Sequence, residues 1–157
     1  NIDSTTIEAM LSACSVYKGY CFPMIGLHPT SVNANYEKEL EIVARELKFS
    51  KEYVARGEIG MDLYWDKTYL KEQQIVLDKQ VNWALEYDLP IVIHCRDAFD
   101  YIYKVLEPYK KTPLRGIFHS FTGTAEEAAR VLEFSDFFIG INGVVTFKKS
   151  HLPEILA

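Results

Sequence analysis

The stretch Pro90-Ile91-Val92-Ile93-His94-Cys95-Arg96-Asp97 decides the fold class of this chain. Three apolar β-branched residues in a row are typical of a strand in a parallel sheet, where both faces of the strand are buried. Residues capable of acid, base or metal chemistry follow at once. The stretch therefore predicts a buried parallel strand that ends on a chemically active residue, His94.

Three further segments share this design, in which an apolar run ends on a histidine or an acidic residue beside a glycine or a helix start. They are residues 22–29, 53–62 and 116–123. In a βα barrel the active site lies at the C-terminal ends of the parallel strands. The recurrence of His and Glu at these points therefore indicates one shared site, and the pattern is typical of a metal-dependent hydrolase.

Helical patterns alternate with the strands. We predict strands near residues 20–26, 53–57, 91–93, 114–119 and 137–141, and helices at 4–17, 36–49, 70–87, 98–106, 124–134 and from 151 onward. The longest helix has as its apolar side Leu70, Ile75, Leu77, Val81, Ala84 and Leu85. This is the sequence form of a parallel α/β sheet or barrel. A (β/α)8 TIM-type barrel needs ~250 residues, so residues 1–157 would form one partial barrel domain.

The composition indicates a globular chain of 157 residues with 48% hydrophobic content, enough for a sizeable core. No apolar stretch approaches the ~20 residues that cross a bilayer, and residues 1–4 lack the features of a signal peptide. The 3 cysteines show no zinc-ribbon spacing, which favours reduced thiols and a cytoplasmic location. The sequence contains no P-loop or dinucleotide motif, so we expect no nucleotide cofactor.

The net charge of −5 argues against a broad basic surface for nucleic acid. Contacts of Lys and Arg with phosphates supply most of the attraction in such surfaces. Any affinity for nucleic acid would therefore come from bound divalent cations or from a local patch.

Glu58 lies between glycines in Gly57-Glu58-Ile59-Gly60. The glycines predict a tight turn that leaves the carboxylate unobstructed at a strand end. A carboxylate there suits a bridge between two divalent metals, or the role of a general base. The alternative is an exposed turn residue, because acidic side chains mostly lie on surfaces.

His94 and His119 each end an apolar run, and imidazole is a common ligand of zinc, manganese and iron. A single histidine in this position is more often a hydrogen-bonded core residue. Two on successive strand ends, after a glutamate on the preceding strand, favour a metal site.

Three residues near these histidines allow two interpretations each. Asp97 begins a predicted helix, where Asp is a preferred N-cap residue, and this capping role is favoured over a role in the site. Arg96 suits either a pair with Asp97 or an anionic substrate. Asp62 suits the support of a metal ligand or water, or the bracing of its own loop.

His28 in Gly26-Leu27-His28-Pro29 again follows a strand. Its imidazole suits contact with a phosphate or donation of a proton, or it braces the turn. Tyr64 and Trp65 lie in the loop after Asp62, where aromatic rings can stack on nucleobases. Packing against the barrel rim is the favoured role for these two rings.

Five motifs, in one order along the chain, resemble the TatD family of metal-dependent deoxyribonucleases. They are residues 26–29, 57–62, 90–98, 118–123 and 143–148. The resemblance implies a (β/α)8 barrel of the amidohydrolase superfamily. It implies that Glu58 is a ligand shared between two metals and that His94 and His119 are ligands of one of them.

The resemblance also implies that Asp62, Arg96 and Asp97 support the ligands or face the substrate, and that His28 lies near the substrate phosphate. The cofactors would be two divalent ions, with Mg, Mn or Zn compatible, and the partner would be DNA. The family's Asp-x-His-x-His and Thr-Asp-x-Pro segments do not occur in this sequence. The chain is therefore expected to supply about strands three to seven, and to be inactive in isolation.

We predict hydrolysis of DNA phosphodiester bonds by two ions and activated water. A second hypothesis is an amidohydrolase-type enzyme that cleaves a small ester, lactone or cyclic amide with the same metals. A third is an α/β binding module without catalytic activity.

Overall fold

The computed structural model describes residues 1–49 and 52–157, and its centre is a sheet of parallel strands. The strands are β1 (Met24–Ile25), β2 (Ala55–Asp62), β3 (Ile91–Arg96), β4 (Gly116–Phe118) and β5 (Phe137–Ile139). They pair in the order β1-β2-β3-β4-β5. Each strand thus lies beside its predecessor in the sequence, as in a βα barrel.

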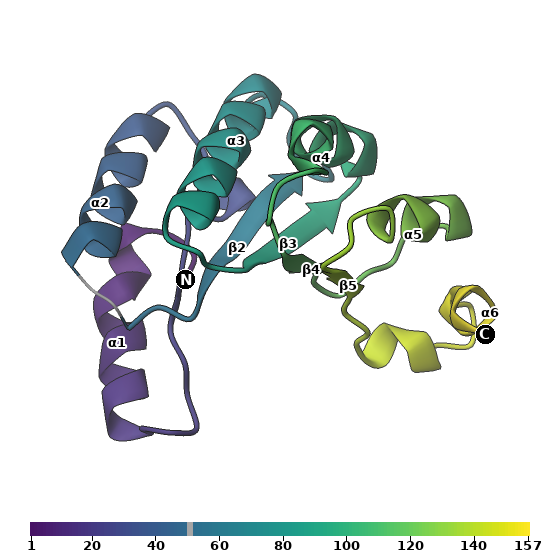
Figure 1. Cartoon of the computed structure of the whole chain (residues 1–157), viewed down its shortest axis with the longest axis horizontal. Coiled ribbons are helices and arrows are strands. Elements are labelled where there is room, and N and C mark those ends of the chain that lie inside the picture. The colour runs from purple at the N-terminus through teal and green to yellow at the C-terminus, as the bar shows by residue number, and fades with distance from the viewer. Residues whose placement is uncertain (50–51) are drawn as a thin grey trace.

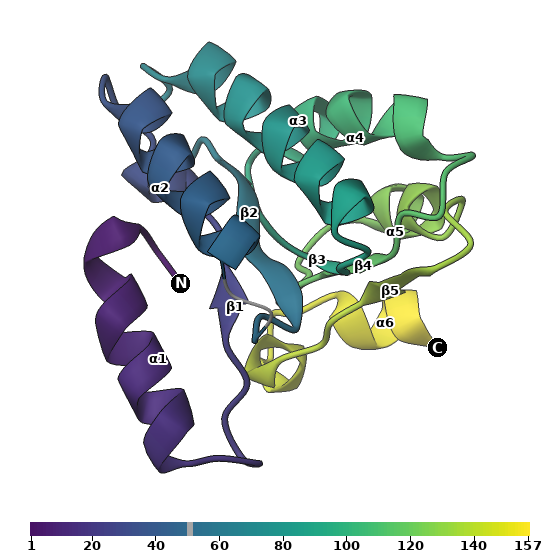
Figure 2. The same ribbon diagram turned by 60° about the vertical axis from the view of Figure 1, so that its left-hand side comes forward.

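Helices connect the strands. They are α1 (Ile7–Val16), α2 (Tyr36–Phe49), α3 (Leu70–Glu86), α4 (Phe99–Leu106), α5 (Ala125–Val131) and α6 (Leu152–Leu156). Helices α2, α3 and α4 lie side by side along the sheet (Figure 1). Figure 2 shows α1 near β1 at one edge and α5 near β5 at the other. The alternation confirms the predicted α/β class and its partial (β/α)8 form.

None of the helices in the described residues is long and apolar enough to cross a membrane. The longest, α3, has 17 residues, and it carries charged side chains along its length. The helices instead cover the sheet.

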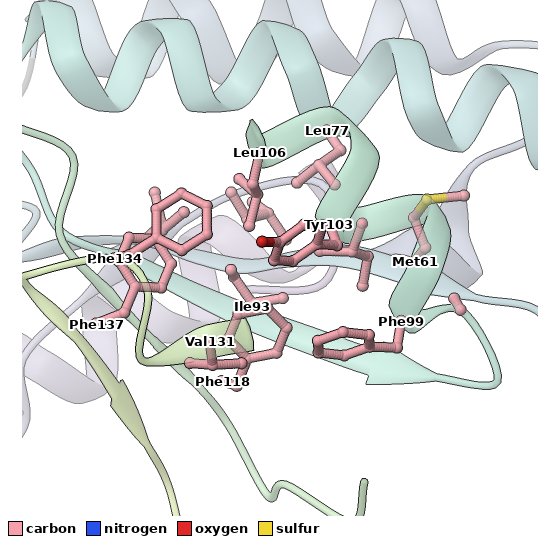
Figure 3. Close-up of a cluster of buried hydrophobic side chains, with 14 of the residues drawn as sticks. Met61, Leu77, Ile93, Phe99, Tyr103, Leu106, Phe118, Val131, Phe134 and Phe137 are labelled. Atoms are coloured by element: carbon pink, nitrogen blue, oxygen red, sulfur yellow. The ribbon is translucent and has the colours of Figure 1, made fainter. Parts of the chain in front are cut away.

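The main core lies between the sheet and α3, α4 and α5 (Figure 3). Its aromatic part runs through Phe99, Phe118, Phe137 and Phe134, whose successive ring centroids are 5.8, 6.3 and 4.8 Å apart. These spacings suit tilted aromatic pairs. The cluster packs α4 and β3–β5 together, so it fixes where the C-terminal ends of these strands lie.

Strand β2 is longer than predicted, and this changes the position of Glu58. The strand runs over Ala55–Asp62, so Glu58 lies within it and not at its end. The pairing with β3 shifts in register between Arg56 and Ile59. The tight turn predicted at Glu58 is therefore wrong. The alternative of an exposed turn residue is wrong as well, because the side chain is only 28% exposed.

Gly60 sets the spacing between β2 and β3 beside the site. It pairs with His94 in the register. Its φ of +137° lies in a region that residues with a side chain rarely adopt. A Cβ at this position would lie 2.0 Å from the backbone oxygen of His94. Glycine therefore permits the strand of Glu58 to approach the strand of His94 closely.

Candidate metal centre

Four of the predicted site residues meet at one end of the sheet. Glu58 comes from β2 and His94 from β3, while His28 follows β1 and His119 follows β4. Glu58 Oε2 lies 3.6 Å from His28 Nε2 and 3.9 Å from His94 Nδ1. Glu58 Oε1 lies 3.5 Å from His119 Nε2. Imidazole nitrogens therefore lie beside both oxygens of one carboxylate.

These separations suit the ligands of a metal ion better than direct hydrogen bonds. Hydrogen bonds from N–H to oxygen span about 2.7–3.2 Å, whereas ligand atoms about 2.1 Å from a tetrahedral ion lie about 3.4 Å from one another. The donor atoms of His28, Glu58 and His94 all lie within 4.8 Å of one another. Within this set, the Glu58 carboxylate and the His94 imidazole have the spacing and the donor types that suit a divalent metal.

Asp62 fixes the orientation of the His94 ring. His94 Nε2 donates to Asp62 Oδ2 at 2.8 Å. A carboxylate only accepts, so Nε2 carries the proton and Nδ1 directs its lone pair toward Glu58. Burial lowers the pKa of His94, against the opposing influence of the bond to Asp62. The ring is therefore neutral at neutral pH and able to bind a metal.

His28 has the same tautomer as His94 but presents its other ring nitrogen to Glu58. It precedes a 3₁₀ turn over Pro29–Ser31, and its Nδ1 accepts a hydrogen bond from the backbone N–H of Thr30 at 3.2 Å. The neutral ring therefore carries its proton on Nε2, which faces Glu58. The His28 ring also packs against the His94 ring, with centroids 4.6 Å apart. His28 thus braces its turn and presents an N–H to the site.

His119 is held less firmly than the other two histidines. Its side chain is 49% exposed, and its Nε2 lies 3.0 Å from the hydroxyl of Ser120. It lines a cavity of about 290 Å³ whose walls include Asp97, Phe121 and Glu127. This side of the centre is therefore open to solvent and to ligands.

The three imidazoles hold the pKa of Glu58 below its usual range. Contact with His28 is the largest cause, and the His119 and His94 rings add to it, against the opposing influence of partial burial. The carboxylate is therefore ionised at neutral pH, which is the state that a metal ligand needs.

Arg96 and Asp97 lie on the exposed rim beside this centre. The guanidinium carbon of Arg96 lies 3.7 Å from the centre of the Tyr64 ring. The N-cap residue of α4 is Ala98, and no side chain makes a capping hydrogen bond there. The prediction that Asp97 caps this helix is therefore wrong. Asp97 instead lines the cavity beside the site.

Two buried glutamines on α3 hold the strand ends that carry the site, and sequence reasoning missed both. Gln80 accepts from the N–H of Leu27 at 2.8 Å and donates to the carbonyl of Leu27 at 3.2 Å. Gln73 makes the same pair of bonds to the backbone of Asp62, at 2.9 and 3.1 Å. Their spacing of seven residues, about two helical turns, puts both amides on one face of α3.

Comparisons with known proteins identify one family. The family model described as "TatD related DNase" matches residues 1–157. "Uncharacterized metal-dependent hydrolase YabD" of Bacillus subtilis (strain 168) is 34% identical over 152 residues, which cover 97% of this chain and 58% of that protein. "3'-5' ssDNA/RNA exonuclease TatD" of Pantoea sp. (strain At-9b) is 34% identical over 129 residues, covering 82% of this chain and 49% of that protein. The chain thus spans about half to three fifths of these relatives.

A solved structure leads to the same family. The crystal structure of YjjV, a TatD homologue from Escherichia coli K12, matches with a TM-score of 0.89 at 28% identity, over 100% of this chain and 60% of that chain. The resemblance carried by the five sequence motifs is thereby confirmed. This chain belongs to the family of TatD-related DNases, whose members include metal-dependent hydrolases.

Proposed function

We propose that the protein containing this chain is a hydrolase that cleaves phosphodiester bonds in DNA with two divalent ions. The observation that carries this proposal is the placement of imidazole nitrogens 3.5–3.9 Å from both oxygens of Glu58. A carboxylate flanked in this way suits a bridge between two ions. Paired metals are a recurrent solution for phosphodiester hydrolysis.

Glu58, His94 and His119 would be the metal ligands within this chain. His94 offers the lone pair of Nδ1, because its Nε2 donates to Asp62. His119 approaches the other oxygen of Glu58. Mg, Mn and Zn are all compatible with imidazole and carboxylate donors. Bound divalent ions supply Lewis-acid polarisation of the phosphoryl group and a water of lowered pKa.

The other site residues act on the substrate or on the ligands. His28 presents its Nε2–H at the centre, and an N–H donor suits an anionic phosphate oxygen. Arg96 and Asp97 lie at the mouth, where Arg96 offers a fixed positive charge to the same anion. Asp62 acts through His94, whose ring it orients. Glu58, ionised and set among three imidazoles, is the catalytic carboxylate.

We assign this activity to the intact protein, acting in the cytoplasm. The chain covers 58% and 49% of two of its relatives, and its sequence lacks the two ligand motifs of the family's first and last strands. Residues 1–157 alone therefore supply part of the ligand set, and we propose that they are inactive by themselves. The relative named as an exonuclease for single-stranded DNA and RNA supports nucleic acid as the substrate.

Hydrolysis assays on the intact protein test this proposal. The substrates are DNA oligonucleotides and, separately, small esters, lactones and cyclic amides, each with Mg²⁺, Mn²⁺ or Zn²⁺. Metal-dependent release of nucleotides that is lost in Glu58→Gln supports the nuclease. Glu154→Gln is the matched control, because Glu154 also lies near a histidine, His151, at 3.7 Å, but on the surface.

Two outcomes would contradict the proposal. Turnover of only the small carbonyl substrates would indicate the amidohydrolase-type alternative. No turnover and no metal uptake by the intact protein would indicate a binding module without catalytic activity.

A further inference from the structure

The loop after β2 holds two large aromatic side chains in solvent. Tyr64 is 48% exposed and Trp65 is 81% exposed. Packing of both rings against the barrel rim, the role favoured from the sequence, is therefore wrong for this part of the chain. Trp65 in particular offers a wide apolar face to a ligand.

The two rings and a neighbouring guanidinium form an ordered cluster. The rings of Tyr64 and Trp65 meet edge to face, with centroids 4.6 Å apart and planes at 89°. The guanidinium carbon of Arg96 lies 3.7 Å from the Tyr64 centroid and 5.9 Å from the Trp65 centroid. Such contacts between a cation and an aromatic face are attractive. They hold the Tyr64 ring and the end of β3 in one arrangement.

This cluster is tied directly to the metal centre. The backbone N–H of Tyr64 donates to Asp62 Oδ1 at 3.1 Å, and the other oxygen of the same carboxylate holds His94. A cavity of about 170 Å³ lies against Trp65, and its walls also include Tyr69, Asp62 and Thr30. Thr30 and Asp62 are the residues that hydrogen-bond to His28 and His94. A ligand that stacks on Trp65 would therefore reach the site.

We propose that Tyr64, Trp65 and Arg96 form a subsite that stacks one unpaired base of a single-stranded nucleic acid beside the metal centre. The subsite rests on the proposed function and adds to it the contact that holds the substrate. An aromatic face stacks on any base, provided that the base is not already stacked within a duplex. Arg96 is placed to pair with the phosphate next to that base.

The net charge of the chain favours base stacking as the source of its affinity for single-stranded nucleic acid. The net charge of −5 leaves little attraction for a long polyanion, and binding through phosphates alone weakens steeply with salt. Binding through a stacked base depends less on salt. We therefore expect a shallow salt dependence for single-stranded oligonucleotides.

Tryptophan fluorescence of the intact protein tests this subsite without turnover. The probes are a ten-residue oligothymidylate and an abasic oligonucleotide of the same length, both added in EDTA. Trp65 and Trp83 are the 2 tryptophans of the chain, and Trp83 lies over the buried Arg56 on the helical side of the sheet. We expect the oligothymidylate to quench Trp65, and the abasic probe to leave the emission unchanged.

Variants complete the experiment. Trp65→Ala should abolish the quenching and weaken oligothymidylate binding about tenfold by anisotropy, whereas Trp65→Phe should retain most of the affinity. Tyr20→Ala is the matched control, because Tyr20 is 89% exposed but precedes β1 at the other end of the strand. It should bind like the wild type.

The outcomes separate the subsite from the proposed function. Equal quenching by the abasic probe, or full affinity in Trp65→Ala, would overturn the subsite even if the protein hydrolyses DNA. Base-dependent quenching in a protein that hydrolyses no DNA would support the subsite and remove the proposed function.

Discussion

The side chains on the two sides of the metal centre are held in place to different degrees. On the side of β1–β3, Gln80 and Gln73 hold the strand ends through their backbone, and Asp62 holds the His94 ring at 2.8 Å. On the side of β4, His119 is half-exposed and its near neighbour is the hydroxyl of Ser120 at 3.0 Å. One side is fixed before any ligand arrives, and the other is open.

This difference follows from how much structure surrounds each strand end. Strand β2 has 8 residues, and α3 packs over it. Strand β4 has 3 residues, and His119 lies just beyond its last one. A metal-ligating side chain on the first side therefore needs little rearrangement when an ion binds. We expect the second side to tolerate change and to admit substrate.

Removal of Glu58 should have the largest effect, because its carboxylate joins the two sides. In the intact protein we expect Glu58→Gln to lower hydrolysis by about 10³-fold or more, since loss of one preorganised electrostatic contact costs about 10²–10³-fold. Calorimetric titration with Mn²⁺ should show weaker uptake. Unchanged metal binding together with unchanged hydrolysis would exclude Glu58 from the centre.

Substitution of Gln80, one of the two buried glutamines of α3, should destabilise the fixed side of the centre. Gln80→Leu leaves the N–H and C=O of Leu27 buried without these bonds, and each such group costs about 1–3 kcal/mol. We therefore expect the free energy of unfolding to fall by about 2–4 kcal/mol, measured by urea denaturation. Gln74→Leu, on the same helix but half-buried, is the control and should change stability by less than about 0.5 kcal/mol.

A test of positioning distinguishes Gln73 from a purely structural residue. Gln73→Leu should weaken Mn²⁺ binding as well as stability, because the backbone that it holds belongs to Asp62. If stability falls but the folded fraction binds Mn²⁺ with wild-type affinity, Gln73 stabilises the fold without positioning the metal ligands.

Substitution of Asp62 and Ser120, the neighbours of the His94 and His119 rings, compares the two sides of the centre directly. Asp62→Ala should weaken metal affinity by about 10–100-fold, as expected for loss of the group that orients a ligand. Ser120→Ala should change it by less than about threefold, because the hydroxyl only neighbours an exposed ring. Equal effects of the two substitutions in metal titrations would contradict the proposed difference between the sides.

The alternation of strands and helices along the chain was predictable from sequence, because it depends on local patterns. His94 was expected at a strand end, but β3 continues past it to Arg96. Apolar runs that end on His94 and His119 identify two strands and their active ends without knowledge of any distant contact. The position of Glu58 within β2 was not predictable. It depends on the register shift toward β3 and on the close approach at Gly60, and both are tertiary features.

The buried face of α3 was also not fully predictable from the sequence. The sequence prediction placed Ile75 on the apolar side, yet Ile75 is 45% exposed while Gln73 and Gln80 are 5% and 0% exposed. Buried backbone groups at the strand ends require partners, and the amides supply them. Glutamines seven residues apart, on the same helical face as the buried Val76 and Leu77, are the signal that would have identified these two residues.

The pH dependence of stability should be the smallest of these effects, and it too separates the two sides. Burial lowers the pKa of His94 from 6.5, so as pH falls the unfolded chain takes up this proton before the folded protein does. The free energy of unfolding of the metal-free protein should therefore decrease as pH falls below 6.5. The pKa of Glu58 is lowered from 4.5, so its contribution is present above that pH and is lost in more acid solution.

Urea denaturation of the metal-free protein between about pH 8 and about pH 5 measures the first of these slopes. His94→Gln should flatten it, because the half-buried ring that resists protonation is gone. His119→Gln is the matched control, since it removes a half-exposed ring from the open side and should leave the slope in place. If the slope survives in His94→Gln but disappears in His119→Gln, the imidazole that resists protonation lies on the side of β4. The contrast between the fixed and open sides would then be reversed.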